Sequence, residues 1–231
     1  MSKRREHRTN DPHGKTPRLK VRGGAAWIGE DPQFKAILRR IDARGFAWEE
    51  VSGDILPIFE RARPFSYPVD PPALAVLPPG VTVGFGVDAG PAFMRVATTH
   101  LAGWPVDLAG LAEQALDNLG RRTLGADPRD LVGDIVADVP IVVFQSQDGW
   151  ASTVVLLPEA MDRLFGRRPA LFVAPSRDLL IGLPSDVDLA FATWLTEEFE
   201  AIDPNALRLE AFEWRDGTVR CRSLLRDAVA V

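Results

Sequence analysis

The block between residues 141 and 183 constrains the fold of this chain more than any other segment. It joins two strongly apolar runs, a helical stretch and two polar turns, at 147–149 and 176–178. Apolar runs of four to eight residues bounded by turn-forming residues are typical of buried strands. If the turns that follow neighbouring strands converge, distant polar groups share one small depression. We therefore expect the functional site of the protein here.

Hydrophobic periodicity predicts strands and helices in mixed order, without the regular alternation of a parallel sheet. The predicted strands form hairpins, of which the one at Asp216-Gly217 carries the strongest turn signal. They cover 81–87, 92–99, 141–144, 170–174, 179–183, 207–214 and 218–221. The predicted helices follow capping residues or prolines and cover 31–45, 107–120, 186–202, a short stretch at 130–137, and a kinked helix at 151–165 that restarts at Pro158. The sequence thus predicts an α+β fold with a largely antiparallel sheet and packed helices.

Charge and proline content divide the chain into three parts. Residues 1–22 carry a net charge of +6, whereas the remainder carries −11. We interpret 1–24 as a disordered basic leader, because its prolines and glycines break any helix. Seven prolines between 57 and 79 predict an extended, irregular segment. Residues 25–80 are therefore expected to form a helix and a wrapping segment, and 81–231 an α+β domain.

The same features bear on location and partners. No apolar run reaches the roughly 20 residues that cross a bilayer, so we expect no membrane association. The lone Cys221 suits a reducing compartment, and a cytoplasmic protein is predicted. The basic leader could hold a nucleic acid, but the acidic remainder would repel it, so nucleic-acid binding is the least favoured partner class.

Several catalytic and cofactor classes lack their residues. Beyond the leader the chain has one histidine, His100, and one cysteine, too few for the usual zinc site. The glycines at 84, 86 and 90 imitate a dinucleotide fingerprint, but a strand follows them where the helix N-terminus should be. A carboxylate-only magnesium site at Asp148 and Asp178 is not required by their spacing. No metal and no cofactor are expected.

Two groups of polar residues remain as site candidates. His100 could act as a general base, oriented by Asp148 or Asp107, with Ser152 as nucleophile, although no Gly-x-Ser-x-Gly elbow surrounds that serine. In the second turn, Arg177 could bind an anionic ligand and Asp178 could bond its own backbone. A purely structural turn is the alternative.

Three segments resemble the YtpQ-like family of uncharacterised bacterial proteins. They read DGWASTVVLLPE from residue 148, VAPSRDLLI from residue 173, and ALDNL from residue 115, the last preceded by Trp104. The resemblance spans about residues 92–214 and implies a cytoplasmic α+β domain without an assigned activity. It supplies no catalytic residues. The positions that match its pattern are Asn118, Ser152, Arg177 and Asp178.

Two functions are weighed from these observations. The first is a non-catalytic bacterial domain that binds a protein partner or a small ligand, since the usual catalytic inventory is missing. The second is a hydrolase that uses Ser152 or a carboxylate, with Arg177 holding an anionic substrate. The hydrolase requires His100, Asp148, Ser152 and Arg177 to line one pocket.

Overall fold

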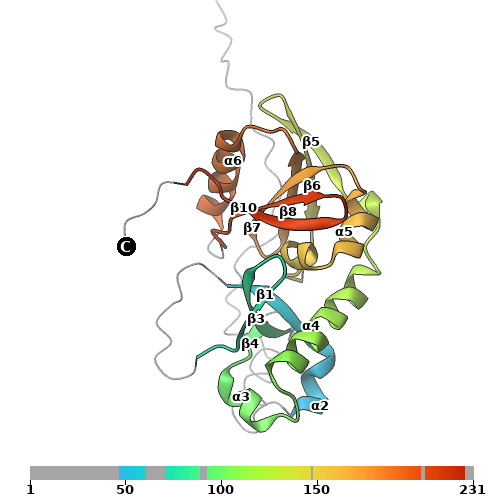
Figure 1. The fold of residues 1–231 in the computed structure, drawn as a ribbon, viewed down its shortest axis with the longest axis vertical. Coiled ribbons are helices and arrows are strands. Elements are labelled where there is room, and N and C mark those ends of the chain that lie inside the picture. The colour runs from blue at the N-terminus through green and yellow to red at the C-terminus, as the bar shows by residue number, and fades with distance from the viewer. Residues whose placement is uncertain (1–46, 61–70, 89–92, 147, 204–205, 227–231) are drawn as a thin grey trace, which may run out of the picture.

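A computed structural model describes residues 47–60, 71–88, 93–146, 148–203 and 206–226 (Figure 1). The basic leader at 1–24 and the helix predicted at 31–45 lie outside these residues. Among the described residues, no helix is both long and apolar enough to cross a membrane.

The larger of two antiparallel sheets has six strands in the order β10-β9-β7-β8-β6-β5. Hydrogen-bonded neighbours all run in opposite directions. The strands are β5 (Val132–Val136), β6 (Val139–Gln145), β7 (Ala170–Ser176), β8 (Leu179–Pro184), β9 (Ala211–Arg215) and β10 (Thr218–Arg222). The predicted β7–β8 and β9–β10 hairpins are confirmed. At the second turn Asp216 and Gly217 both have positive φ, 52° and 74°, as an Asp-Gly turn favours.

The smaller sheet has four strands, with β1 on one side of β3 and both β2 and β4 on the other. Its strands are β1 (Ile55–Phe59), β2 (Leu74–Leu77), β3 (Val81–Asp88) and β4 (Phe93–Arg95). Two of them fall in the segment that the prolines predicted to be irregular. Pro57 is tolerated because β1 is an edge strand, where a missing N–H need not break a ladder.

Helices lie beside both sheets. They are α2 (Trp48–Val51), α3 (Thr98–Gly103), α4 (Leu108–Thr123), α5 (Pro158–Phe165) and α6 (Leu189–Ile202), with 3-10 turns η2 (Ser52–Asp54), η3 (Pro128–Asp130) and η4 (Ala151–Leu156). The predicted caps hold at α4, where Asp107 accepts the N–H of Gly110 at 2.9 Å, and at Pro158, which begins α5. Helix α6 is capped by Asp188 itself, so the prediction that it begins at 186 is wrong by one turn.

Two further element predictions are wrong. The helix predicted at 130–137 is replaced by strand β5, which pairs with β6 across a turn where Ala137 and Asp138 have φ of 48° and 65°. This pairing outweighs the helical spacing of the apolar residues. The strand predicted at 92–99 ends at Arg95, because helix α3 begins at Thr98.

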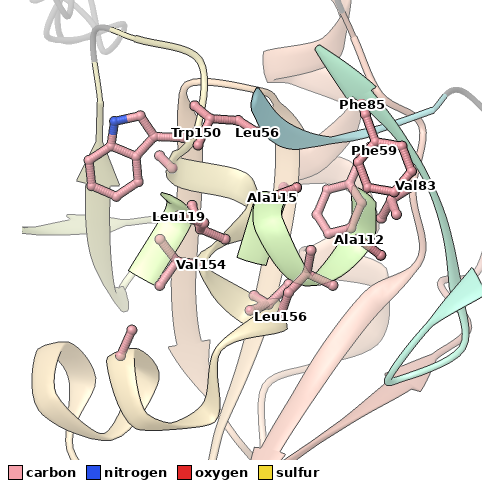
Figure 2. Packing of buried hydrophobic residues seen from close by; sticks show 14 of the residues in the cluster. Leu56, Phe59, Val83, Phe85, Ala112, Ala115, Leu119, Trp150, Val154 and Leu156 are labelled. Carbon is pink, nitrogen blue, oxygen red and sulfur yellow. The ribbon is translucent and has the colours of Figure 1, made fainter. Parts of the chain in front are cut away.

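Strands β7 and β8, in the middle of the large sheet, are buried on both faces, and alternate side chains along them belong to separate cores. Leu171 and Val173 of β7 pack with α6 on one face, whereas Phe172 and Ala174 face the other core. That second core also contains side chains of the small sheet, α4, η4 and α5 (Figure 2). The rings of Phe59 and Phe212, one from each sheet, stack with centroids 5.6 Å apart. The two sheets therefore share one hydrophobic core.

Helix α4 connects the two regions. Figure 1 shows it extending from the side of the small sheet toward the large sheet. Arg122 in its last turn lines one pocket with Phe144 and Gln145 of β6. The apolar stripe of α4, including Leu111, Ala115 and Leu119, is buried against β1. The polar C-terminal turn of α4 is thereby brought close to the end of β6.

Candidate functional site

The turn between β7 and β8 lies directly against the loop that follows β6. The Asp178 carboxylate accepts hydrogen bonds from Gly149 N–H at 2.5 Å and from Ser146 Oγ at 3.3 Å. Ser146 Oγ in turn accepts the N–H groups of Trp150 and Ala151 at 3.1 and 3.0 Å. The two predicted turns thus lie in contact, and these polar groups form hydrogen bonds with each other rather than facing a shared pocket.

Burial raises the pKa of the Asp178 carboxyl above its ordinary value, although the hydrogen bonds from Gly149 and Ser146 act in the opposite direction. The nearby carboxylates of Asp203 and Asp148 raise it further. The Asp178 carboxylate already accepts hydrogen bonds from Gly149 and Ser146, so its role is explained without a bound ligand. We therefore interpret Asp178 as a residue that holds the loop after β6 in place.

Ser152 contacts the β7–β8 turn through its backbone. Its backbone N–H donates to the carbonyl of Arg177 at 3.0 Å, and its side chain is fully buried. Among the described residues, the Oγ atom has no hydrogen-bond partner. It is thus paired with no base and has no path to solvent.

His100 and Asn118 lie elsewhere. His100 sits on α3, where Nδ1 accepts the N–H of Ala97 at 2.9 Å and the ring stacks on Trp104, with centroids 5.8 Å apart. Figure 1 shows α3 at the opposite end of the molecule from the large sheet. The one pocket that the hydrolase required, with His100 and Ser152 together, is not formed by these residues.

Asn118 is a structural residue of α4. Its amide nitrogen donates to the carbonyls of Ser52 and Ile55 at 2.7 and 2.8 Å. Its oxygen accepts from Gln114 Nε2 at 2.9 Å and from the Arg121 guanidinium. These bonds fasten α4 to the start of β1, so the side chain is fully used within the protein.

A charged cluster that the sequence did not indicate joins the two sheets. The Glu60 carboxylate follows β1, is 10% exposed, and lies 3.0 Å from Nη2 of Arg95 on β4. Burial raises the pKa of this carboxyl, and the positive charges of Arg95 and Arg177 oppose that rise. Among the described residues its Oε1 has no hydrogen-bond partner, and it would lie 2.6 Å from a Cβ at position 84, so a side chain there would displace the end of Glu60.

Beside the β7–β8 turn lies an open depression of about 450 Å³, which we call the α4–β6 pocket. It lies between the end of α4 and the end of β6, and this volume is within the range of small-ligand sites. Its lining combines two aromatic rings with charged and amide groups. The lining residues that matter below are Arg122, Ala126, Asp130, Phe144, Gln145 and Trp150.

Trp150 distinguishes this pocket from an ordinary surface hollow. Only 9% of the residue is exposed, yet within the described part of the chain its indole N–H has no hydrogen-bond acceptor. Figure 2 places its ring at the margin of the packed core. By contrast, the indole N–H of the buried Trp214 donates to the carbonyl of Gly166 at 2.8 Å. Among the described residues, the indole nitrogen of Trp150 is not one of the enclosed polar atoms that lack a partner, so it is open to solvent at the edge of the pocket.

Arg122 supplies a positive charge from the last turn of α4. Its Nη1 lies 3.8 Å from Oδ2 of Asp148, whose side chain is 61% exposed. An exposed pair at this separation contributes little to stability. Asp148 is thus a candidate residue from the sequence that forms an ion pair with a residue lining this pocket.

The described residues contain no group of three or more His, Cys, Asp or Glu side chains placed to hold a metal ion. Comparison of the chain with protein-family models, with curated proteins and with solved structures finds no match. The site must therefore be interpreted from its own geometry.

Sequence reasoning missed the pocket residues for identifiable reasons. Trp150 is one of six tryptophans scattered along the chain, and Arg122 follows Arg121 in a helix end that carries no motif. A signal for Trp150 existed in the polar segment 145–149, which places an aromatic residue directly after a strand end. Glu60 had no local signal, because its partners are 35 and 117 positions away along the chain, at Arg95 and Arg177.

Proposed function

We propose that this protein is a non-catalytic domain that binds a small polar ligand in the α4–β6 pocket. The single observation that carries the proposal is the lining of this pocket, which brings the rings of Phe144 and Trp150 together with polar side chains around a volume of about 450 Å³. Binding sites for small ligands typically combine an apolar wall with a few polar groups in this way.

Binding rather than catalysis is favoured by the state of the candidate nucleophile. Ser152 Oγ is enclosed and unpaired, whereas a nucleophile needs a base in contact and access for the substrate. The carboxylates near the pocket are arranged differently from a catalytic pair. Asp178 is occupied by backbone and serine donors, and Asp148 faces solvent beside Arg122.

The indole resonances of the six tryptophans provide a direct test. In ¹⁵N-labelled protein, Trp150→Phe identifies the Trp150 indole signal, and Trp214→Phe identifies that of Trp214 as an internal control. A panel of carboxylic acids, amines, amides and amino acids is then added one compound at a time. We expect at least one compound to shift the Trp150 signal in a saturable way while the Trp214 signal stays in place. If no compound of the panel does so, the proposal is wrong.

We further propose that the chain is a bacterial, cytoplasmic member of the YtpQ-like family. The support is the motif residues Asn118, Ser152, Arg177 and Asp178, together with a single cysteine. In this fold Asn118 and Asp178 have structural roles, as family-wide positions often do. Fractionation of the native host should place the tagged chain with soluble cytoplasmic markers. Recovery in the membrane or culture medium would contradict this location.

A further inference from the structure

The exposed side of α6 carries a tryptophan, whereas the outer face of a surface helix is usually polar. Trp194 is 45% exposed, and its ring lies against that of Phe191 with centroids 5.7 Å apart. Beside the helix lies Leu225, 62% exposed, whose N–H donates to Thr193 Oγ1 at 3.1 Å. Grouped apolar side chains of this kind often mark an interaction site. Helical spacing places five exposed residues on one stripe, which we call the α6 outer face: Ala190, Trp194, Glu197, Glu198 and Ala201.

The segment that contains α6 is strongly acidic. Residues 186–203 hold six acidic and no basic residues. Two arginines from the segment that follows the helix contact it, and both bind Glu200. Arg226 pairs with this carboxylate through two hydrogen bonds of 2.9 Å, and the backbone N–H of Arg208 donates to it at 3.0 Å. The negative charge of Glu200 is therefore compensated within the protein.

Glu197 and Glu198 are not compensated in this way. Both are exposed, and within the described part of the chain neither carboxylate forms an ion pair or a hydrogen bond. The last turn of α6 contains no basic residue, although the carbonyl groups at the C-terminal end of a helix favour cations there. The α6 outer face thus presents two negative charges beside an exposed aromatic ring, and a basic segment would complement both features.

This chain contains such a segment in its leader. Residues 1–22 hold eight basic and two acidic residues, and five of the basic ones are arginines. Guanidinium groups stack on aromatic rings and pair with carboxylates, so arginine suits this face better than any other residue. Residues 23–46 separate the segment from the first described residue and can span at most about 80 Å. The radius of gyration of a folded chain of this length is about 17 Å, so the segment can reach α6.

We propose that residues 1–22 of this chain bind to the α6 outer face. Arginine side chains lie on the ring of Trp194, and the positive charges of the segment lie opposite Glu197 and Glu198. Covalent attachment favours this segment over one from another protein, because it raises the effective concentration near the helix. No residue of the α6 outer face lines the α4–β6 pocket, so the inference is independent of the proposed function.

A spin label at the start of the leader tests this contact in the intact chain. Ser2→Cys carries the nitroxide, and Cys221→Ser prevents labelling of the exposed native cysteine. The indole signal of Trp194, assigned with Trp194→Phe, is compared before and after reduction of the nitroxide. We expect it to lose roughly half of its intensity or more at low salt, and less at high salt, because salt screens exposed charges. Trp104 is the internal reference, since it directly follows α3, which Figure 1 shows at the opposite end of the molecule from α6.

Charge reversal on α6 identifies the surface. Glu197→Lys together with Glu198→Lys should restore the Trp194 signal to its intensity with reduced nitroxide, because like charges repel. Glu113→Lys together with Asp117→Lys, at exposed positions of α4, changes the net charge by the same amount and should leave the broadening unchanged. Thermal unfolding of both double variants shows that they are folded.

Three results would overturn the inference. The first is a Trp194 signal that is broadened no more than that of Trp104. The second is broadening that persists after charge reversal on α6, since the leader would then be held elsewhere. The third comes from a mixture of ¹⁵N-labelled chain without a nitroxide and spin-labelled chain without ¹⁵N. Broadening of Trp194 in this mixture means that the leader of a second copy, rather than that of the same chain, occupies the α6 outer face.

Discussion

Two neighbouring regions at one end of the large sheet differ in what their polar groups do. In the contact between the β7–β8 turn and the β6 loop, Asp178 and Ser146 accept hydrogen bonds from within the protein. In the α4–β6 pocket, Asp130 and Gln145 are exposed, and Arg122 pairs with the exposed Asp148 at 3.8 Å. The first region uses its polar groups to hold loops in place, whereas Asp130 and Gln145 of the second are open to solvent.

The difference shows why polar residues in a turn are a weak guide to a site. A turn needs hydrogen-bond acceptors for its own backbone, and Asp or Ser side chains supply them. A binding site needs polar groups that the fold does not use. The two regions therefore respond differently to the same kind of substitution.

The largest effect should come from Asn118, the most fully used of the predicted site residues. Asn118→Ala removes two donors and leaves the carbonyls of Ser52 and Ile55 unsatisfied in a buried place. We expect the free energy of unfolding to fall by about 3 kcal/mol, measured by urea denaturation. Asp117→Ala, at an exposed neighbouring position, should change it by less than about 0.5 kcal/mol. Equal effects of the two variants would show that Asn118 is not structural.

The two buried tryptophans give a sharper comparison. Trp214→Phe removes the donor to Gly166 and shrinks a fully buried side chain, so we expect a loss of about 2 kcal/mol. Trp150→Phe removes an N–H that has no partner in the described residues, and should cost about half as much or less. Urea denaturation measures both changes. If Trp150→Phe is the more destabilising of the two, its N–H is already bonded within the protein.

Two aspartates provide the next test. Asp178→Ala removes the acceptor of Gly149 N–H and Ser146 Oγ, and we expect a loss of about 1–2 kcal/mol together with exchange broadening of residues 146–151 in amide spectra. Asp148→Ala removes an exposed carboxylate, and its stability should change by less than about 0.5 kcal/mol. If Asp178→Ala changes neither the free energy of unfolding nor the amide spectra, the loop is held by its other contacts.

The smallest effect concerns pH. Burial raises the pKa of Glu60 above 4.5 in the folded protein, so the folded state binds this proton more readily than the unfolded state. Its contribution therefore favours folding at low pH and is lost as the pH rises from 4.5 through the raised pKa. Asp178 has the same sign, with a window that opens at 3.8.

Glu60→Gln isolates this contribution, since glutamine cannot titrate. We expect the stability of the natural protein to fall more, or rise less, than that of the variant as the pH increases above 4.5. Unfolding free energies at a series of pH values measure the difference, and the exposed Glu113→Gln is the control. Parallel pH profiles for Glu60→Gln and the natural protein would contradict the expected proton linkage.

The sequence predicted those parts of the fold that depend on neighbours along the chain. The Asp107 cap of α4, the Pro158 start of α5 and the Asp216-Gly217 hairpin each follow from a residue whose backbone preference acts within one turn. Prediction was wrong at 130–137, where the pairing of β5 with β6 outweighed helical spacing. Residues 57–59 and 74–77 are extended as predicted, but they pair with β3 as regular strands rather than forming an irregular segment.

The candidate site, like the fold, has features that local sequence signals predict and features that depend on distant residues. Its general place, around the turns that follow neighbouring strands, could be read from the apolar runs and the turn residues. Which polar groups remain available there could not, because that depends on distant partners. Asp178 finds Gly149 at a separation of 29 residues, and Asn118 finds Ile55 at a separation of 63.

By itself the sequence determined an α+β fold with antiparallel hairpins, because caps, prolines and tight turns act locally. Only the tertiary structure decided that two sheets share a core and that α4 ends beside β6. It also decided that the indole N–H of Trp214 donates to the carbonyl of Gly166, whereas Trp150 lines the α4–β6 pocket. Burial and long-range packing determine which hydrogen bonds are made, and neither is written in the spacing of residues along the chain.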